Sequence, residues 1–167
     1  MGKSNTLTIL KHAILMERKG RSLYLKAMEH TRDEAVKSFF KDLADDEQEH
    51  INILEKQFKA FMTDGKFMAG DFENNARAVD APQILDEAVK GKISAAGFEA
   101  VAITAAIGFE EKAVKTYAEQ AEKTDDPEEK RIYTWLSTWE KTHLKKLMAL
   151  EESLMERVWE DNNFWPM

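Results

Sequence analysis

The sequence has 167 residues, a formal net charge of −7 and no cysteine. This length fits one domain with a sizeable core, and the absence of cysteine excludes disulfides, iron–sulfur clusters and thiolate zinc sites. The acidic balance and the lack of a basic stripe exclude nucleic acid as a partner.

The sequence contains no signal for membrane insertion or export. No apolar run approaches the roughly eighteen residues of a membrane span, and the first eleven residues lack the apolar core of a signal peptide. We therefore expect no membrane partner and a cytoplasmic location.

The first half of the chain is predicted to form a helical hairpin. From about residue 6 to residue 30 the apolar residues recur at intervals of three and four, which is typical of an amphipathic helix, yet Glu17 lies within the apolar stripe. A Thr-Arg-Asp-Glu segment follows and predicts a turn and the capped start of a second helix over 33–62. The apolar face of that helix is interrupted in the same way, by Glu47 and His50. Because burying an unpartnered charge costs several kcal/mol, these side chains require partners.

Residues 63–93 break this periodicity. Their Gly, Asn and Pro residues indicate a connection, in which a short helix is expected over 82–90. A third helix with a small, apolar interior is predicted over 94–123 and a fourth over 127–160. The Thr-Asp-Asp-Pro-Glu-Glu segment between them supplies an N-cap, a proline at the first helical position and acidic residues in the first turn. The tail, residues 163–167, is apolar, and no role is assigned to it.

The two hairpins carry the same constellation of carboxylate and imidazole side chains. In each, a Glu precedes a Glu-x-x-His motif by thirty positions, and each member of the second set lies 93 positions after its counterpart. The six residues are Glu17, Glu47 and His50 in the first hairpin and Glu110, Glu140 and His143 in the second. Residues 14–54 are identical to residues 107–147 at twelve of 41 positions. Unrelated sequences of this composition would match at roughly one position in sixteen, so an internal repeat is the better interpretation.

Distances along the helices predict that the six side chains meet. Glu17 and Glu47 each lie fourteen residues from the turn that joins their helices, which is about 21 Å at roughly 1.5 Å per residue. Glu110 and Glu140 lie at the same distance from the turn of the second hairpin. The connection is long enough to return across the bundle, so the second hairpin is expected to start at the same end as the first. Four carboxylates in one dry layer would repel one another, whereas two divalent cations would neutralise them. We predict a binuclear metal site whose carboxylate and imidazole ligands suit iron or manganese, with zinc as a further occupant.

This arrangement on four helices resembles the ferritin-like di-iron carboxylate superfamily, and within it the rubrerythrin-like branch. The resemblance covers about 6–62 and 94–160. It implies an all-α, ferritin-like four-helix bundle, with a long crossover between helices two and three, an internal pseudo-two-fold repeat and a single domain over 1–167. It also implies two iron ions (Fe2+/Fe3+), with Glu17 and Glu110 as terminal ligands, Glu47 and Glu140 as bridging ligands, and His50 and His143 as one imidazole for each metal.

Two features depart from full-length rubrerythrins. The chain has no cysteine-ligated rubredoxin domain. The positions three before and three after Glu110 are Ile107 and Ala113, where rubrerythrins tend to carry an extra Glu ligand. The six-ligand set is therefore closer to bacterioferritin or to stand-alone rubrerythrin-like proteins.

The resemblance implies a di-iron enzyme, an oxidoreductase that reduces hydrogen peroxide or dioxygen under oxidative stress. Because no second redox centre is encoded, electrons would come from a separate donor protein, rubredoxin-like or a reductase, and a homodimer is expected. The alternative is a ferroxidase that stores or passes on oxidised iron, since both activities use the same six ligands. A third reading is a non-enzymatic helical interaction protein with a structural metal.

Other residues near the predicted ligands have several interpretations. Tyr24 and Tyr117 share the offset of 93 residues. They are interpreted either as hydrogen-bond donors to the Glu of a neighbouring helix or electron donors near the metals, or as core tyrosines. The remaining candidates are given no chemical role: Glu49 and Glu111 (solvated), His12 and His30 (surface), and Trp135, Trp139 and Trp159 (packing or dimer contacts).

Overall fold

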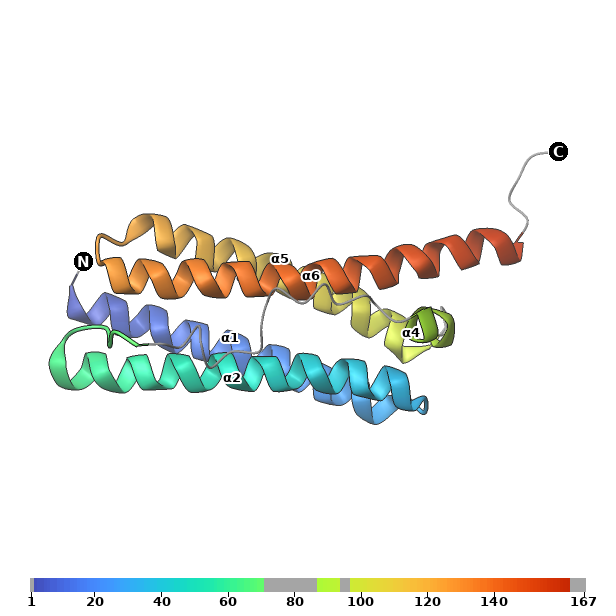
Figure 1. The fold of residues 1–167 in the computed structure, drawn as a ribbon, viewed down its shortest axis with the longest axis horizontal. Coiled ribbons are helices and arrows are strands. Elements are labelled where there is room, and N and C mark those ends of the chain that lie inside the picture. The colour runs from blue at the N-terminus through green and yellow to red at the C-terminus, as the bar shows by residue number, and fades with distance from the viewer. Residues whose placement is uncertain (1, 71–86, 94–96, 163–167) are drawn as a thin grey trace.

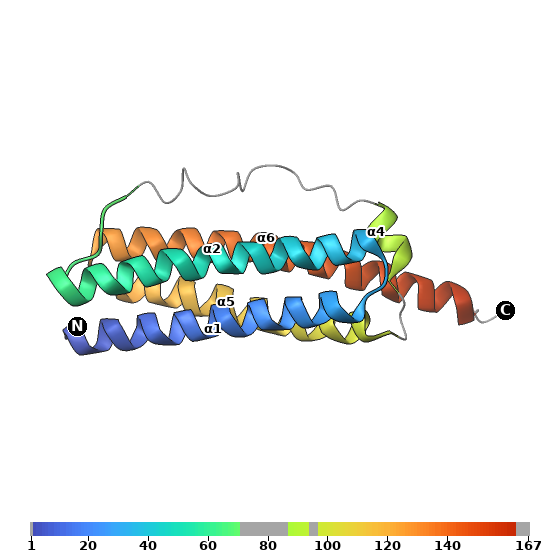
Figure 2. The same cartoon turned by 90° about the horizontal axis from the view of Figure 1, so that it is seen from below.

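The computed structural model describes residues 2–70, 87–93 and 97–162, and all regular structure in these residues is helical. The helices are α1 (Lys3–His30), α2 (Glu34–Asp64), α4 (Glu87–Lys92), α5 (Phe98–Lys123) and α6 (Pro127–Asn162). Four long helices form an elongated bundle in which α1 and α2 make one hairpin and α5 and α6 the other (Figure 1). In the perpendicular view, α1 and α5 lie on one side of the bundle and α2 and α6 on the other (Figure 2). The predicted all-α, ferritin-like bundle is confirmed.

Both tight turns follow the predicted capping chemistry. The Asp33 carboxylate accepts hydrogen bonds of 2.9 and 3.1 Å from the backbone N–H groups two and three residues further on, at the start of α2. Asp126 does the same at the start of α6, at 2.9 and 3.0 Å. These bonds satisfy backbone donors that have no partner within the helix, so each new helix begins directly after its turn.

The C-terminus of α2 is set by a glycine. Gly65 adopts a left-handed conformation with φ 67°, and its N–H donates a 2.9 Å hydrogen bond to the carbonyl of Phe61. A residue with a Cβ is disfavoured in this conformation, which makes glycine the usual residue just past a helix end. The helix therefore extends to Asp64, two residues beyond the predicted end.

The start of the third long helix differs from the prediction. Gly97 is the N-cap of α5 and has an extended backbone (φ −88°, ψ 169°), so the helix begins at Phe98 rather than at residue 94. Residues 94–96 and the tail 163–167 lie outside the described residues. So does the first part of the short helix expected over 82–90; the described part of this region is α4.

The second hairpin starts at the opposite end of the bundle from the first, so the expectation of a common end was wrong. Helix α4 and the start of α5 lie beside the turn between α1 and α2 (Figure 1), where Lys92 Nζ is 3.4 Å from the Asp33 carboxylate. Helices α1 and α5 are therefore antiparallel, and the pseudo-two-fold axis runs across the bundle. Because Glu17 lies near the middle of α1, helices running in either direction reach its level, and the six side chains still meet.

The core consists of two apolar clusters at different heights in the bundle. The cluster towards the turn between α1 and α2 includes Tyr24, Phe40 and Ile103, and the other cluster includes Tyr117 and Tyr133. The six carboxylate and imidazole residues belong to neither cluster; they form a separate buried layer along the helices. None of the described helices is long and apolar enough to cross a membrane.

Candidate metal centre

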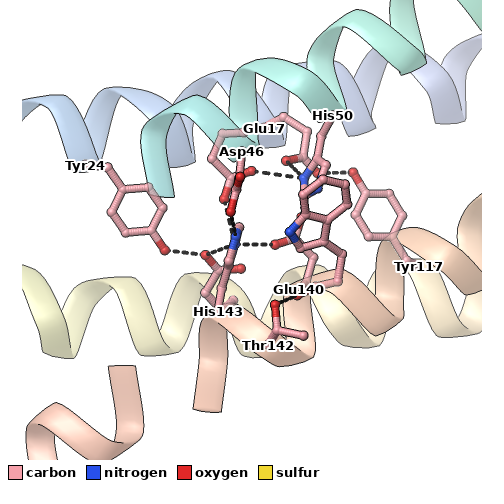
Figure 3. A network of polar contacts seen from close by, with 11 residues as sticks. Glu17, Tyr24, Asp46, His50, Tyr117, Glu140, Thr142 and His143 are labelled. Atoms are coloured by element: carbon pink, nitrogen blue, oxygen red, sulfur yellow. Dashed lines mark hydrogen bonds and ion pairs between the residues drawn. The ribbon is translucent and has the colours of Figure 1, made fainter. Parts of the chain in front are cut away.

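The structure brings all six predicted ligand residues together in the interior of the bundle. Figure 3 labels four of them, Glu17, His50, Glu140 and His143. Each of the four long helices contributes to the site, with one Glu each from α1 and α5 and a Glu-x-x-His pair each from α2 and α6. All six side chains are buried, with relative exposures of 0 to 1%: Glu17, Glu47, His50, Glu110, Glu140 and His143. Charged residues are this deeply buried only when they are paired or bind a metal.

The six residues form two overlapping groups of four. In each group, one ligand atom from every residue lies within 4.8 Å of the others. Glu47 and Glu140 belong to both groups, whereas Glu17 and His50 belong to one and Glu110 and His143 to the other. Two carboxylates shared between two ligand sets is the arrangement that a binuclear centre with bridging ligands requires.

Both imidazoles turn the same nitrogen towards the carboxylates. His50 Nδ1 lies 2.9 Å from Glu140 and 3.3 Å from Glu17. His143 Nδ1 lies 3.0 Å from Glu140 and 3.4 Å from Glu110. The ring centroids are 5.9 Å apart with an interplanar angle of 28°. Each histidine thus presents Nδ1 to its own group, which leaves Nε2 to face the surrounding protein.

Several buried polar atoms of the site lack a hydrogen-bond partner among the described residues. They include both carboxylate oxygens of Glu47, both of Glu140, and Nδ1 of His143. The short distances between the imidazoles and these carboxylates therefore do not correspond to satisfied hydrogen bonds. Leaving such a group unsatisfied costs about 1–3 kcal/mol, and more when it is charged. Two cations held by carboxylate oxygens and imidazole nitrogens would satisfy these atoms, so the donor set fits a binuclear metal site.

Without a cation, the buried charges perturb one another strongly. Burial and the neighbouring Glu140 raise the pKa of Glu47 well above its ordinary value, and the same two causes raise the pKa of Glu110 to about 8. Burial opposes ionisation of Glu140 as well, but the two histidines outweigh it and hold its pKa below the ordinary range. Burial also opposes charging of His50, yet the Glu140 charge dominates and its pKa rises. Protons would therefore balance these buried charges in the metal-free protein.

The two tyrosines connect the hairpins at the site. The Tyr24 hydroxyl on α1 donates a hydrogen bond to Glu110 on α5, and the Tyr117 hydroxyl on α5 donates one to Glu17 on α1 (Figure 3). Burial, and then the adjacent carboxylates, raise the pKa of both tyrosines, so both remain protonated donors. Each hydroxyl fixes one oxygen of a predicted terminal ligand and leaves the rest of that carboxylate available.

Two residues that the ligand spacing does not single out contact the histidines. Asp46, which directly precedes Glu47, places Oδ2 3.0 Å from His143 Nε2. Trp139, which directly precedes Glu140, packs edge-on against His50 with ring centroids 4.6 Å apart. The only sequence signal for either is its place beside a predicted bridging Glu. Packing or a dimer contact was the interpretation given to Trp139, and the residue is buried.

Four other singled-out residues lie outside the groups of possible metal ligands. Glu111, His12 and His30 are exposed, and Glu49 is half-buried. His30 packs against Phe98 with ring centroids 4.6 Å apart. None of these four residues belongs to the groups of possible metal ligands among the described residues.

The positions one turn from Glu110 are apolar, as the sequence indicates. Ile107 and Ala113 are buried within the two apolar clusters. No carboxylate from this part of α5, other than Glu110, reaches the described groups of possible metal ligands.

Two helical hairpins that enclose four buried Glu and two buried His define a ferritin-like protein with a site compatible with two metal ions. The sequence matches the rubrerythrin family over residues 8–151, and the chain belongs to that family. The resemblance to the rubrerythrin-like branch is thereby confirmed.

The solved structures that share the fold include two that cover most of this chain. One is a hypothetical protein from Pyrococcus furiosus, 24% identical, with a TM-score of 0.62 and 89% of each chain covered. The other is a two-domain protein from Anabaena variabilis with DJ-1/ThiJ/PfpI-like and ferritin-like domains; it is 17% identical with a TM-score of 0.66, over 92% of this chain and 40% of that one. No curated protein matches the chain significantly.

Proposed function

We propose that this protein binds two iron ions and uses them to reduce hydrogen peroxide, with electrons supplied by a separate donor protein, rubredoxin-like or a reductase. The observation that supports this most directly is the pair of overlapping buried ligand groups that share Glu47 and Glu140. The donor set is made of carboxylates and imidazoles without thiolate, which suits iron. When bound, two ferrous ions supply the two electrons that cleave an O–O bond.

The residues of the chain would hold the metals and exclude water. Glu47 and Glu140 would bridge the two ions and keep them at reacting distance, and the tyrosine hydroxyls would fix the orientation of Glu17 and Glu110. The apolar clusters would keep the layer dry, so that the charges of the ligands act in a low dielectric.

A groove between α1 and α5 offers a route for a small reactant. Its volume is about 440 Å³, and its lining includes Met16, Phe109 and Tyr117. Tyr117 is itself buried and bonded to Glu17, so this one side chain lies between the groove and a predicted ligand. Peroxide and dioxygen are small enough to enter by such a route.

The proposal is tested with anaerobic protein loaded with two equivalents of Fe(II) and mixed by stopped flow with hydrogen peroxide or with oxygenated buffer. Faster oxidation by peroxide than by oxygen is the expected result. Glu47→Ala combined with Glu140→Ala should abolish iron uptake, whereas the exposed neighbour variant Glu111→Ala should not change it. Equal uptake by the double variant and the wild type would overturn the proposal.

A ferroxidase is the second candidate, supported by the apolar Ile107 and Ala113 where rubrerythrins tend to carry a further ligand. It predicts the opposite result in the same experiment. Oxidation by oxygen would be the faster reaction, and it would continue beyond two irons per chain.

A further inference from the structure

The contacts around the ligand layer, the buried layer of the six predicted ligand residues, follow the internal repeat at the tyrosines but not at the histidines. Tyr24 and Tyr117 occupy equivalent positions and make equivalent hydrogen bonds across the bundle. Asp46 and Trp139 also occupy equivalent positions, 93 residues apart, and each contacts the histidine of the other hairpin. One of these two is a carboxylate and the other is an indole. The two histidines therefore have different surroundings.

His143 has a charged hydrogen-bond partner on its outer nitrogen. Asp46 Oδ2 lies 3.0 Å from His143 Nε2, and Asp46 is only 6% exposed, so solvent screens this interaction little. A carboxylate at this nitrogen keeps the proton on Nε2, so that Nδ1 presents its lone pair to the site. It also orients the ring and strengthens the imidazole as a donor, and losing such a partner typically costs about 10–100-fold in metal affinity.

His50 lacks this support. Its Nε2 is buried and has no hydrogen-bond partner among the described residues. Its ring is flanked instead by the indoles of Trp139 and Trp135, with ring centroids 4.6 and 6.0 Å away and interplanar angles of 82° and 76°. Indole edges hold the ring in place but supply no charge and no strong acceptor.

We infer that the two metal subsites are inequivalent, and that Asp46 is the positioning residue that makes the His143 subsite the tighter one. The first ion bound occupies the subsite of Glu110 and His143. The subsite of Glu17 and His50, beside Trp139, fills second. This inference rests on the metal binding in the proposed function, but not on peroxide chemistry.

The location of the first ion is the decisive measurement. The first cation repels the second, so unequal stepwise affinities can arise even in a symmetric site and alone would prove nothing. A symmetric site would instead distribute one ion equally between the subsites. Crystals grown with one equivalent of Co(II) per chain and measured for anomalous scattering should show the larger peak beside His143.

Asp46→Asn tests the assigned cause. In crystals with one equivalent of Co(II) the preference for His143 should disappear or reverse, and anaerobic calorimetry should show the first binding step weakened by about 10-fold or more. Asp45→Asn is the matched control, because Asp45 is the neighbouring acid on α2 but pairs with Lys41 at the surface, and it should change neither result. Trp139→Asp, if circular dichroism shows that it folds, should strengthen metal binding at the His50 subsite. The Asp46→Asn result tests the inference whether or not Trp139→Asp folds.

The outcomes separate this inference from the proposed function. Two bound ions with equal first occupancy in the wild type would overturn the inference and leave the di-iron proposal intact. So would an Asp46→Asn protein that is less stable but keeps the wild-type distribution of the first ion, because Asp46 would then have a structural role only. Failure to bind any metal would overturn both.

Discussion

Tyr117 and Tyr133 stack with ring centroids 6.0 Å apart, and of their two buried hydroxyls only that of Tyr117 has a hydrogen-bond partner among the described residues. The first hairpin contains the equivalent stacked pair, but with phenylalanine in place of the second tyrosine. There Tyr24 stacks on Phe40 at 6.5 Å, and Phe40 is the counterpart of Tyr133 in the repeat. The Tyr133 hydroxyl is therefore an addition to the repeated pattern that no hydrogen bond in the described structure requires.

Replacing Tyr133 by Phe should not destabilise the protein. An unsatisfied buried hydroxyl carries a desolvation cost of about 1–3 kcal/mol, so its removal is expected to leave the free energy of unfolding unchanged or raise it by about 1 kcal/mol. Urea denaturation of the metal-free protein measures this directly. A loss of stability greater than about 1 kcal/mol would show that the hydroxyl is bonded after all, for example through water.

The two tyrosines at the site should respond differently from Tyr133. Tyr24→Phe and Tyr117→Phe each remove the donor that orients one predicted terminal ligand, Glu110 or Glu17. Each should weaken the binding of one of the two metals by about 10–100-fold. Competition with a chromophoric chelator measures both affinities, and Tyr133→Phe serves as the control with one buried hydroxyl removed. Wild-type affinities in both variants would show that the tyrosines act only in packing.

The meeting of the six predicted ligand residues could be inferred from the sequence because helical geometry fixes their depth in the bundle. A capped turn joins the two helices of each hairpin, and the rise per residue then puts Glu17 and Glu47 at one level, equally far from that turn. A carboxylate within the apolar stripe of a helix is expected only where it has a buried partner or binds a metal. This pattern is therefore a specific indication of a buried polar site. The capping roles of Asp33 and Asp126 followed from similarly local chemistry.

The features that the sequence did not provide depend on relations between helices. The direction of the second hairpin could not be inferred from the depth of Glu17, because a residue at mid-helix reaches the same level in either orientation. Asp46 and Trp139 each contact a histidine of the other hairpin. The spacing of residues within one hairpin does not predict contacts between side chains of different hairpins. The difference between the two histidines therefore appears only in the folded structure.

The N-caps should contribute to stability without affecting the metal site. Asp126→Ala removes an acceptor from two backbone N–H groups, and it should lower the free energy of unfolding by about 1 kcal/mol. Asp33→Ala should cost somewhat more, because Asp33 also lies near Lys92. Chemical denaturation measures both, and metal affinity should be unchanged because both caps lie far from the ligand layer. A change in metal affinity without a change in stability would contradict this.

The metal-free protein should become less stable as the pH rises. The pKa of Glu110 is raised from its ordinary value of 4.5 to about 8, so between these values the folded protein binds a proton that the unfolded chain has lost. The stabilisation is complete below about 4.5 and is lost as the pH rises through about 8. The raised pKa values of His50 and His143 act in the same direction above about 6.5.

Calorimetric melting between about pH 5 and pH 9, with a chelator or with two equivalents of Zn(II), would measure this dependence. We expect the melting temperature to fall across the range in chelator and to change much less with zinc, because bound cations keep the carboxylates ionised. Asp46 does not offset this loss of stability, because its pKa is lowered and its carboxyl therefore titrates below the pH range of the experiment. Glu110→Gln should flatten the chelator curve, and a metal-free protein that gains stability from pH 5 to 8 would contradict the electrostatic picture.

Metal binding should release protons in a number that the site predicts. The pKa values of Glu47, Glu110, His50 and His143 are all raised, so near neutral pH each of these four groups carries a proton that a cation must displace. Glu140 releases none, because the histidines already hold it ionised. Binding two divalent cations should therefore release about four protons, and the affinity should rise with pH. Titrations with Zn(II) in buffers of different ionisation enthalpy give the number directly. Glu110→Gln should lower it by about one, whereas release of no protons by the wild type would mean that metals do not enter this layer.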